Sequence, residues 1–440
     1  MKILELVGIL QMLNNKKKLL FFVLFINLFL SINLPAQTNI LGLDDCIGLA
    51  IKNNPQIKIA EANYEGSSAN VTLTRSVLMP QISLVSSGAR SGGTFITGPI
   101  SREANYNTFG VGFQGSMMLF DFGKSYSKLS SASELSDAAG YDLNNTVQTI
   151  TLNTTIAYYN YLQSKRINEV NKEIVRQSEE HLKQSKSFYD VGKKPQFDVI
   201  KAETDLAGAS LNLIKSQNNV KISRLQLENL LGIKLKADSE LKDNLDIDEI
   251  GMIELNKALE SAFVNRPDLL ANTMRLEANK SLVTSAWTTH LPSISLTSGL
   301  NWRSYDLNQK FNNSWNLGVN FTLPLFQGWG IDAAVQIAKS NLKASEYSNE
   351  YLKQQIILDV QQQFLSYEEA HERIDVSRKL VSQAEETLKL AEGRYNSEVG
   401  SAIEVTDARV TLLNAQIAYI QALYDSKITL ARLKKAMGGK

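Results

Sequence analysis

The segment 291–326 alternates between apolar and polar residues, and this pattern restricts the possible fold more than any other in the chain. From residue 293 apolar side chains occupy one parity, and the alternation resumes after a polar tip at 305–313. Because strand side chains point alternately to opposite faces, the segment predicts a β-hairpin with one apolar and one polar face. Lipid outside and water inside would suit both faces, as in a membrane β-barrel. The residues of this hairpin expected to face lipid are Trp315, Leu317, Val319, Phe321 and Leu323.

The same pattern occurs earlier in the chain. The run Pro80–Leu84 matches Pro292–Leu296, and Leu119-Phe120 matches Leu325-Phe326. We therefore predict an internal two-fold sequence repeat, and finding such a repeat constrains the whole fold. The first repeat spans 37–232 with a hairpin at 81–120, and the second spans 255–440 with a hairpin at 292–326, joined by a linker at 233–254. In the first hairpin Phe109, Val111 and Phe113 are expected to face lipid.

The beginning of the chain resembles a secretory signal. Three lysines at 16–18 precede the apolar run 19–30, and Leu34-Pro35-Ala36 follows. We expect a signal peptide region at 1–36, cleaved after Ala36. A membrane anchor is the alternative, although the run is shorter than the roughly 20 residues that span a bilayer. Cys46 is the single cysteine, so we expect no internal disulfide, and it lacks the surroundings of a lipidated cysteine.

Long helices are predicted between the hairpins. The segment that follows Gly123 as far as 189 has no proline, has one glycine at 140, and repeats apolar residues every three to four positions. Such helices need packing along an apolar seam. Similar reasoning predicts helices at 43–79, 197–231, 255–290, 330–395 and 402–437, with turns at 191–195 and 399–400.

The number of strands predicts an oligomer. Two hairpins supply four strands, whereas bacterial barrels close with eight or more. Four strands would leave edge groups without hydrogen bonds in lipid, where such groups are costly. Several copies must therefore share one barrel. The net charge of +1 gives no reason to expect a nucleic acid partner.

These features together resemble the TolC-like outer membrane efflux protein family, over about 39–438. The most specific motifs are Leu43–Cys46 with Asn54-Pro55, the prolines 80 and 292 before the strands, and the turn-to-helix segments 189–202 and 395–408. The resemblance implies a mixed α and β membrane protein: a homotrimer with a 12-stranded β-barrel in outer-membrane lipid, four strands per chain, and a long periplasmic α-helical barrel. It also implies a passive exit duct for tripartite efflux or type I secretion. The partners would be a periplasmic adaptor (membrane fusion protein) and an inner-membrane transporter.

The resemblance also implies sites near the two turns. The pore constriction at the periplasmic mouth would contain Glu404, Asp407, Asp198 and Tyr395, although carboxylates at a helix N-terminus are favourable anyway and Tyr395 could equally be a packing residue. Family members that lock this mouth carry an arginine between the turn glycine and the acidic pair, where this chain has no arginine. The turns that would dock the adaptor consist of Val191, Gly192, Lys193, Lys194, Pro195, Val399, Gly400, Ser401 and Ala402.

Other functions are less well supported by the residues. A structural or adhesive coiled-coil stalk would explain the helices but not the two hairpins. An enzyme would need a nucleophile and a base, and His181, His290 and His371 lie on different segments without a metal-binding or catalytic pattern. The motif Gly110–Gly115 resembles a dinucleotide fingerprint, but it lies inside a predicted strand without the following helix. We therefore expect no enzyme activity, no metal and no cofactor.

Overall fold

A computed structural model describes residues 40–97, 100–236, 239–243 and 254–439, which form two compact units. The smaller unit takes its described residues from 40–42 and 235–242 and contains strands β1 (Ile40–Leu41) and β4 (Glu240–Leu241), which pair in parallel. The predicted linker 233–254 thus contains a strand that the sequence analysis missed. The predicted signal peptide 1–36 and the middle of the linker, 244–253, lie outside the described residues.

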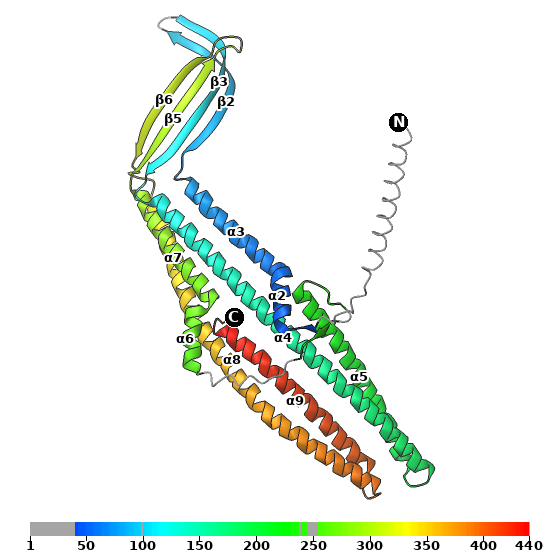
Figure 1. Cartoon of the computed structure of the whole chain (residues 1–440). Coiled ribbons are helices and arrows are strands. Elements are labelled where there is room, and N and C mark those ends of the chain that lie inside the picture. The colour runs from blue at the N-terminus through cyan, green and yellow to red at the C-terminus, as the bar shows by residue number, and fades with distance from the viewer. Residues whose placement is uncertain (1–39, 98–99, 237–238, 244–253, 440) are drawn as a thin grey trace, which may run out of the picture. The chain divides into compact units, whose positions relative to one another are not determined.

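The larger unit contains one order of elements twice (Figure 1). The first half runs α2 (Leu43–Asn53), α3 (Pro55–Ser76), β2 (Gln81–Thr97), β3 (Ile100–Phe120), α4 (Lys124–Asp190) and α5 (Gln196–Leu231). The second runs α6 (Leu255–Asn265), α7 (Pro267–Trp287), the 3₁₀ turn η1 (Thr288–His290), β5 (Ser293–Ser304), β6 (Asn312–Thr322), α8 (Gly330–Asn396) and α9 (Ala402–Ala436). The predicted long helices and both hairpins are therefore present.

Two predicted helices, 43–79 and 255–290, are each interrupted. Asn54 caps the N-terminus of α3, and its side chain accepts a hydrogen bond of 2.9 Å from the backbone N–H of Gln56. Pro55 and Pro267 occupy the first turns of α3 and α7, where a missing N–H costs nothing. A proline disfavours helical geometry in the residue before it, so the chain bends at both positions.

The hairpins form one four-stranded antiparallel sheet in the order β2-β3-β5-β6. Strand β3 begins at Ile100, which pairs with Thr97 at the end of β2. Strand β6 ends at Thr322, and Leu323 precedes Pro324, which lacks the N–H that a ladder needs. Leu323 was predicted to be a lipid-facing strand residue, and it lies beyond the strand.

Helices α4 and α8 contain 67 residues each, which corresponds to about 100 Å at 1.5 Å per residue. An apolar seam along α8 is buried, and near the turn between α8 and α9 it packs against α9. Its buried members are Ile356, Val360, Ile374, Ala384, Leu388 and Ala391. None of the described helices has a stretch long and apolar enough to cross a membrane.

Candidate functional site at the sheet and the paired helical turns

The sheet separates apolar from polar side chains as the alternation predicted. On one face Phe113 is opposite Leu300, which is itself opposite Trp315. On the other face Asn301 lies between Gly112 and Ser314. The apolar residues of β6 are highly exposed in the single chain: Trp315 76%, Leu317 66%, Val319 65% and Phe321 65%. An apolar face of this size needs a partner surface to cover it.

The register changes near the end of β3. Met118 pairs with Ser295 and Phe120 pairs with Ile294, so Leu119 forms a β-bulge between them. An extra residue shifts the parity of the strand. Phe120 therefore lies on the apolar face, where strict alternation from Phe113 would place Leu119.

The turn between α4 and α5 and the turn between α8 and α9 lie next to each other. Lys193 of the α4–α5 turn forms an ion pair of 2.9 Å with Glu398 of the α8–α9 turn, and this pair lowers the pKa of the Glu398 carboxyl. Gln184 donates a hydrogen bond of 2.7 Å to Asn396 nearby. Side chains of both halves of the chain thus bridge the two turns. Exposed pairs of this kind contribute little stability, so tighter contacts must hold the turns together.

One tighter contact joins Tyr395 and Asp198. The Tyr395 hydroxyl donates a hydrogen bond of 3.2 Å to Asp198, and only 1% and 7% of these residues are exposed. Burial raises the pKa of Tyr395. The Lys194 ammonium lies 4.5 Å from the centre of the Tyr395 ring and also contacts the carbonyl of Gly400. Both residues predicted at the constriction are therefore buried between helices in this chain rather than open to solvent.

The other two predicted constriction residues are exposed. Glu404 and Asp407 lie in the first turns of α9, where Ser401 caps the helix by accepting a bond from the Glu404 N–H. Arg394 of α8 reaches Glu404 at 3.2 Å. No arginine lies between Gly400 and Glu404 in the sequence, and the contribution of one from the preceding helix was not predicted.

Most of the predicted docking residues form the exposed ends of the two turns. Val191, Pro195 and Val399 are exposed, while the tight turn leaves no room for a side chain at Gly400. Ala402 is different, because it is 3% exposed and packs in the core cluster of α8 and α9. Its inclusion among the docking residues is wrong for this chain, since a buried methyl group has no surface to offer.

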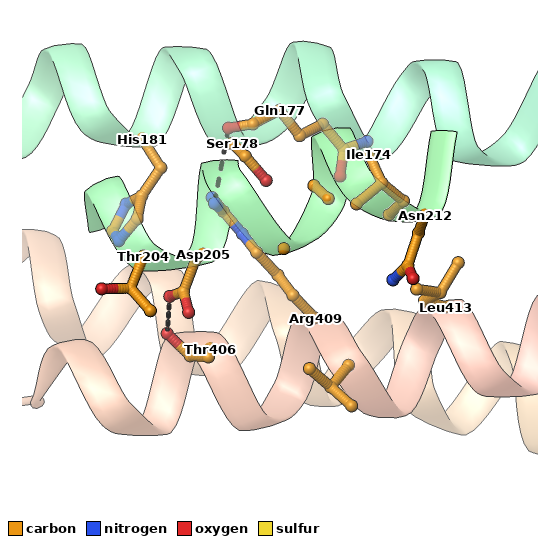
Figure 2. A pocket seen from close by; sticks show the side chains of 13 residues that line it. Ile174, Gln177, Ser178, His181, Thr204, Asp205, Asn212, Thr406, Arg409 and Leu413 are labelled. Atoms are coloured by element: carbon orange, nitrogen blue, oxygen red, sulfur yellow. Dashed lines mark hydrogen bonds between the residues drawn. The ribbon is translucent and has the colours of Figure 1, made fainter. Parts of the chain in front are cut away.

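A cluster of polar side chains near Tyr395 was not predicted from the sequence. It consists of Gln177, His181, Glu392 and Arg409. Figure 2 shows Arg409 extending from α9 towards α4, near His181. The Arg409 guanidinium contacts the Gln177 carbonyl at 3.4 Å and Glu392 at 2.8 Å. His181 is 5% exposed, and its ring centre lies 5.6 Å from that of Tyr395. The sequence could have pointed to His181 only by showing that its position on the predicted helix is buried. The side chains around it come from three other helices, and the sequence does not show which helices meet.

The comparison with known proteins decides the family. Residues 46–233 and 258–439 match the sequence profile described as outer membrane efflux protein. The chain belongs to the outer membrane efflux protein family.

Members of this family with similar sequences include two bacterial proteins. The probable efflux pump outer membrane protein TtgC of Pseudomonas putida is 25% identical over 406 residues, covering 90% of this chain and 83% of that protein. Outer membrane protein TolC of Escherichia coli is 23% identical over 409 residues, covering 88% of this chain and 80% of TolC.

Solved structures share the fold. The CmeC outer membrane channel of Campylobacter jejuni gives a TM-score of 0.82 at 22% identity, covering 90% of this chain and 85% of CmeC. CusC gives a TM-score of 0.82 at 21% identity, covering 93% of this chain and 96% of CusC.

Family membership places the protein in the outer membrane with its helical part in the periplasm. The family consists of efflux channels and is not an enzyme family.

Cys46 is fully buried, and burial raises the pKa of its thiol to about 11. Within the described ranges no group of three or more His, Cys, Asp or Glu residues could hold a metal ion.

Proposed function

We propose that this protein is the outer-membrane exit duct of a tripartite efflux or type I secretion system. The observation that supports this proposal best is the sheet, in which β2 and β6 are edge strands and the two faces differ in polarity. Unpaired backbone groups are costly in lipid, so these edges need partner strands. Edge β6 of one copy would pair with edge β2 of the next, with the apolar face towards lipid and the polar face around water.

A homotrimer satisfies this requirement with three sets of four strands in one 12-stranded barrel. Three copies of the long helices would continue the barrel as a periplasmic tunnel. The two-fold repeat supports this arrangement, because the element order occurs twice and the family profile matches two separate segments. Each chain would then contribute two similar halves to the wall.

The paired turns would form the periplasmic mouth. In the closed state Tyr395 and Asp198 hold the turns together, while Glu404 and Asp407 supply carboxylates around the axis. A periplasmic adaptor, docking on the exposed ends of the turns, would separate them and connect the duct to an inner-membrane transporter. The duct itself is passive, and the transporter supplies the energy.

Electrical recording in a planar lipid bilayer tests this proposal against a coiled-coil stalk. We expect the purified protein to carry a small ionic current that rises when Tyr395→Ala weakens the contact between the turns. Tyr347→Ala is the matched control, because Tyr347 lies on the same helix and is 60% exposed. Inserted protein that carries no current, with or without Tyr395→Ala, would rule out a duct and favour a stalk.

A further inference from the structure

We propose that acid loosens the closed mouth through His181, whose protonation beside Arg409 weakens the packing of α8 and α9 against α4. The inference rests on the proposed duct function for its biological meaning. The contacts that support it lie near the turns that join α4 to α5 and α8 to α9.

The position of His181 makes its charge state important. It lies on α4 with 5% of its surface exposed, and it borders a cavity of about 200 Å³ whose other walls come from α5 and α9. Figure 2 shows its ring extending from α4 towards Thr204 of α5. The packed surroundings leave His181 with little of the solvent that would stabilise a charge on its ring.

Arg409 is the contact that a second cation would disturb. Its guanidinium bonds to the Gln177 carbonyl of α4 and to Glu392 of α8, so one side chain connects three helices. Its side chain is 17% exposed. Like charges repel strongly when solvent screening is weak, so an imidazolium in this cavity would act against the Arg409 contact.

The charged and titratable groups around His181 are already engaged. On α5, Asp205 binds Lys201 at 2.5 Å and the Thr406 hydroxyl at 2.6 Å, and Asp198 accepts the bond from Tyr395. On α8, Glu392 binds Arg409, and on α4 Glu180 binds Arg176 at 2.6 Å. These carboxylates attract an imidazolium, but each would have to give up or share its present partner to neutralise it.

The electrostatic balance favours neutral His181 in the closed mouth. Burial, followed by the charge of Arg409, lowers its pKa below the ordinary value, against the opposing effects of Asp205, Glu392 and Asp198. A solvated histidine titrates near pH 6.5. Below about that pH the open state therefore binds a proton that the closed state does not. Closure is fully stable above pH 6.5, and it weakens as the pH falls from there towards the lower pKa of the closed state.

The size of the effect has an upper limit set by one proton. If only the open state is protonated, the opening equilibrium increases by at most about tenfold for each pH unit below 6.5. A change of this size is measurable by hydrogen–deuterium exchange of peptides from 402–412, after correction for the intrinsic pH dependence of exchange. We expect exchange in the full-length protein to be faster at pH 5.5 than at pH 7.5.

Substitutions assign the response to His181. His181→Gln cannot be protonated and should exchange equally at both pH values, and His181→Leu is a second variant in case one of them fails to assemble. His371→Gln is the control, because His371 is an exposed histidine on α8, and it should respond like the wild type. An acid response that persists in the His181 variants, or its absence from the wild type, would overturn the inference.

Recording current in parallel separates this inference from the duct proposal. A current that rises in acid for wild type but not for His181→Gln supports both. Protein without current, whose exchange still depends on His181, would refute the duct while supporting the acid response of the helices.

Discussion

The buried hydrogen bond between Tyr395 and Asp198 gives a quantitative prediction. Tyr395→Phe removes one hydroxyl and leaves the ring in its contacts with Phe188 and His181. The Lys194 ammonium also stays over the ring, since that interaction needs only the aromatic face. The substitution therefore removes the hydrogen bond between α5 and α8 without removing the aromatic ring.

The magnitude follows from the burial of both partners. Tyr395 is 1% exposed and Asp198 is 7% exposed, so water cannot readily replace the lost donor. A hydrogen bond to a charged group contributes about 1.5–3 kcal/mol. The equilibrium constant for separating the turns should therefore rise by about 10- to 150-fold, since each 1.4 kcal/mol is a factor of ten.

Hydrogen–deuterium exchange of the peptides that contain 397–405 measures this change in the full-length protein. Tyr347→Phe is a matched control, because Tyr347 is also on α8 and has a lysine ammonium, that of Lys343, 5.9 Å from its ring centre, but it is 60% exposed. We expect faster exchange in Tyr395→Phe alone. Equal exchange in the two variants would show that the hydroxyl does not hold the turns together.

Two further predictions concern the sheet and the mouth. Phe321→Lys should destabilise the assembled barrel by about 2–4 kcal/mol if it lies near the bilayer midplane, whereas Asn320→Lys on the opposite face should have a mild effect. Thermal dissociation of the oligomer measures both effects. Equal tolerance of the two substitutions would contradict the assignment of faces. A trivalent cation added from the periplasmic side should block the current by binding carboxylates, and the double substitution Glu404→Ala with Asp407→Ala should abolish the block. Arg394→Ala should strengthen the block, because it releases Glu404 from its ion pair.

Much of the fold was predictable because the signals are local. Alternation along 293–322 fixes which side chains share a face, and the paired strands confirm the predicted faces in register. Uninterrupted apolar periodicity predicted α4 and α8 almost to their ends. The helix breaks at Asn54-Pro55 and Arg266-Pro267 were not predicted, although a proline is common in the first turn of a helix and can mark a helix start.

The remaining features depend on contacts between distant segments. Arg409 contacts Gln177, 232 positions away, and Tyr395 contacts Asp198, 197 positions away. A single sequence gives the chemistry of these residues but not which helix faces meet. Tyr395 and Asp198 were therefore expected at the pore constriction, with packing as the alternative for Tyr395, and both are buried. The short strands β1 and β4 also pair across a long stretch of sequence. They were missed because two residues are too few to show a periodicity.

The central claim is that separate copies of the chain close one barrel by pairing β6 with a neighbour's β2. Engineered cysteines test it directly: Asn320→Cys on β6 is combined in turn with Ser83→Cys, Val85→Cys and Ser87→Cys on the polar face of β2, in a Cys46→Ser background. After oxidation in outer membranes, we expect at least one pair to give covalently linked trimers. Disulfides confined to single chains, or no disulfide for any pair, would contradict the shared barrel.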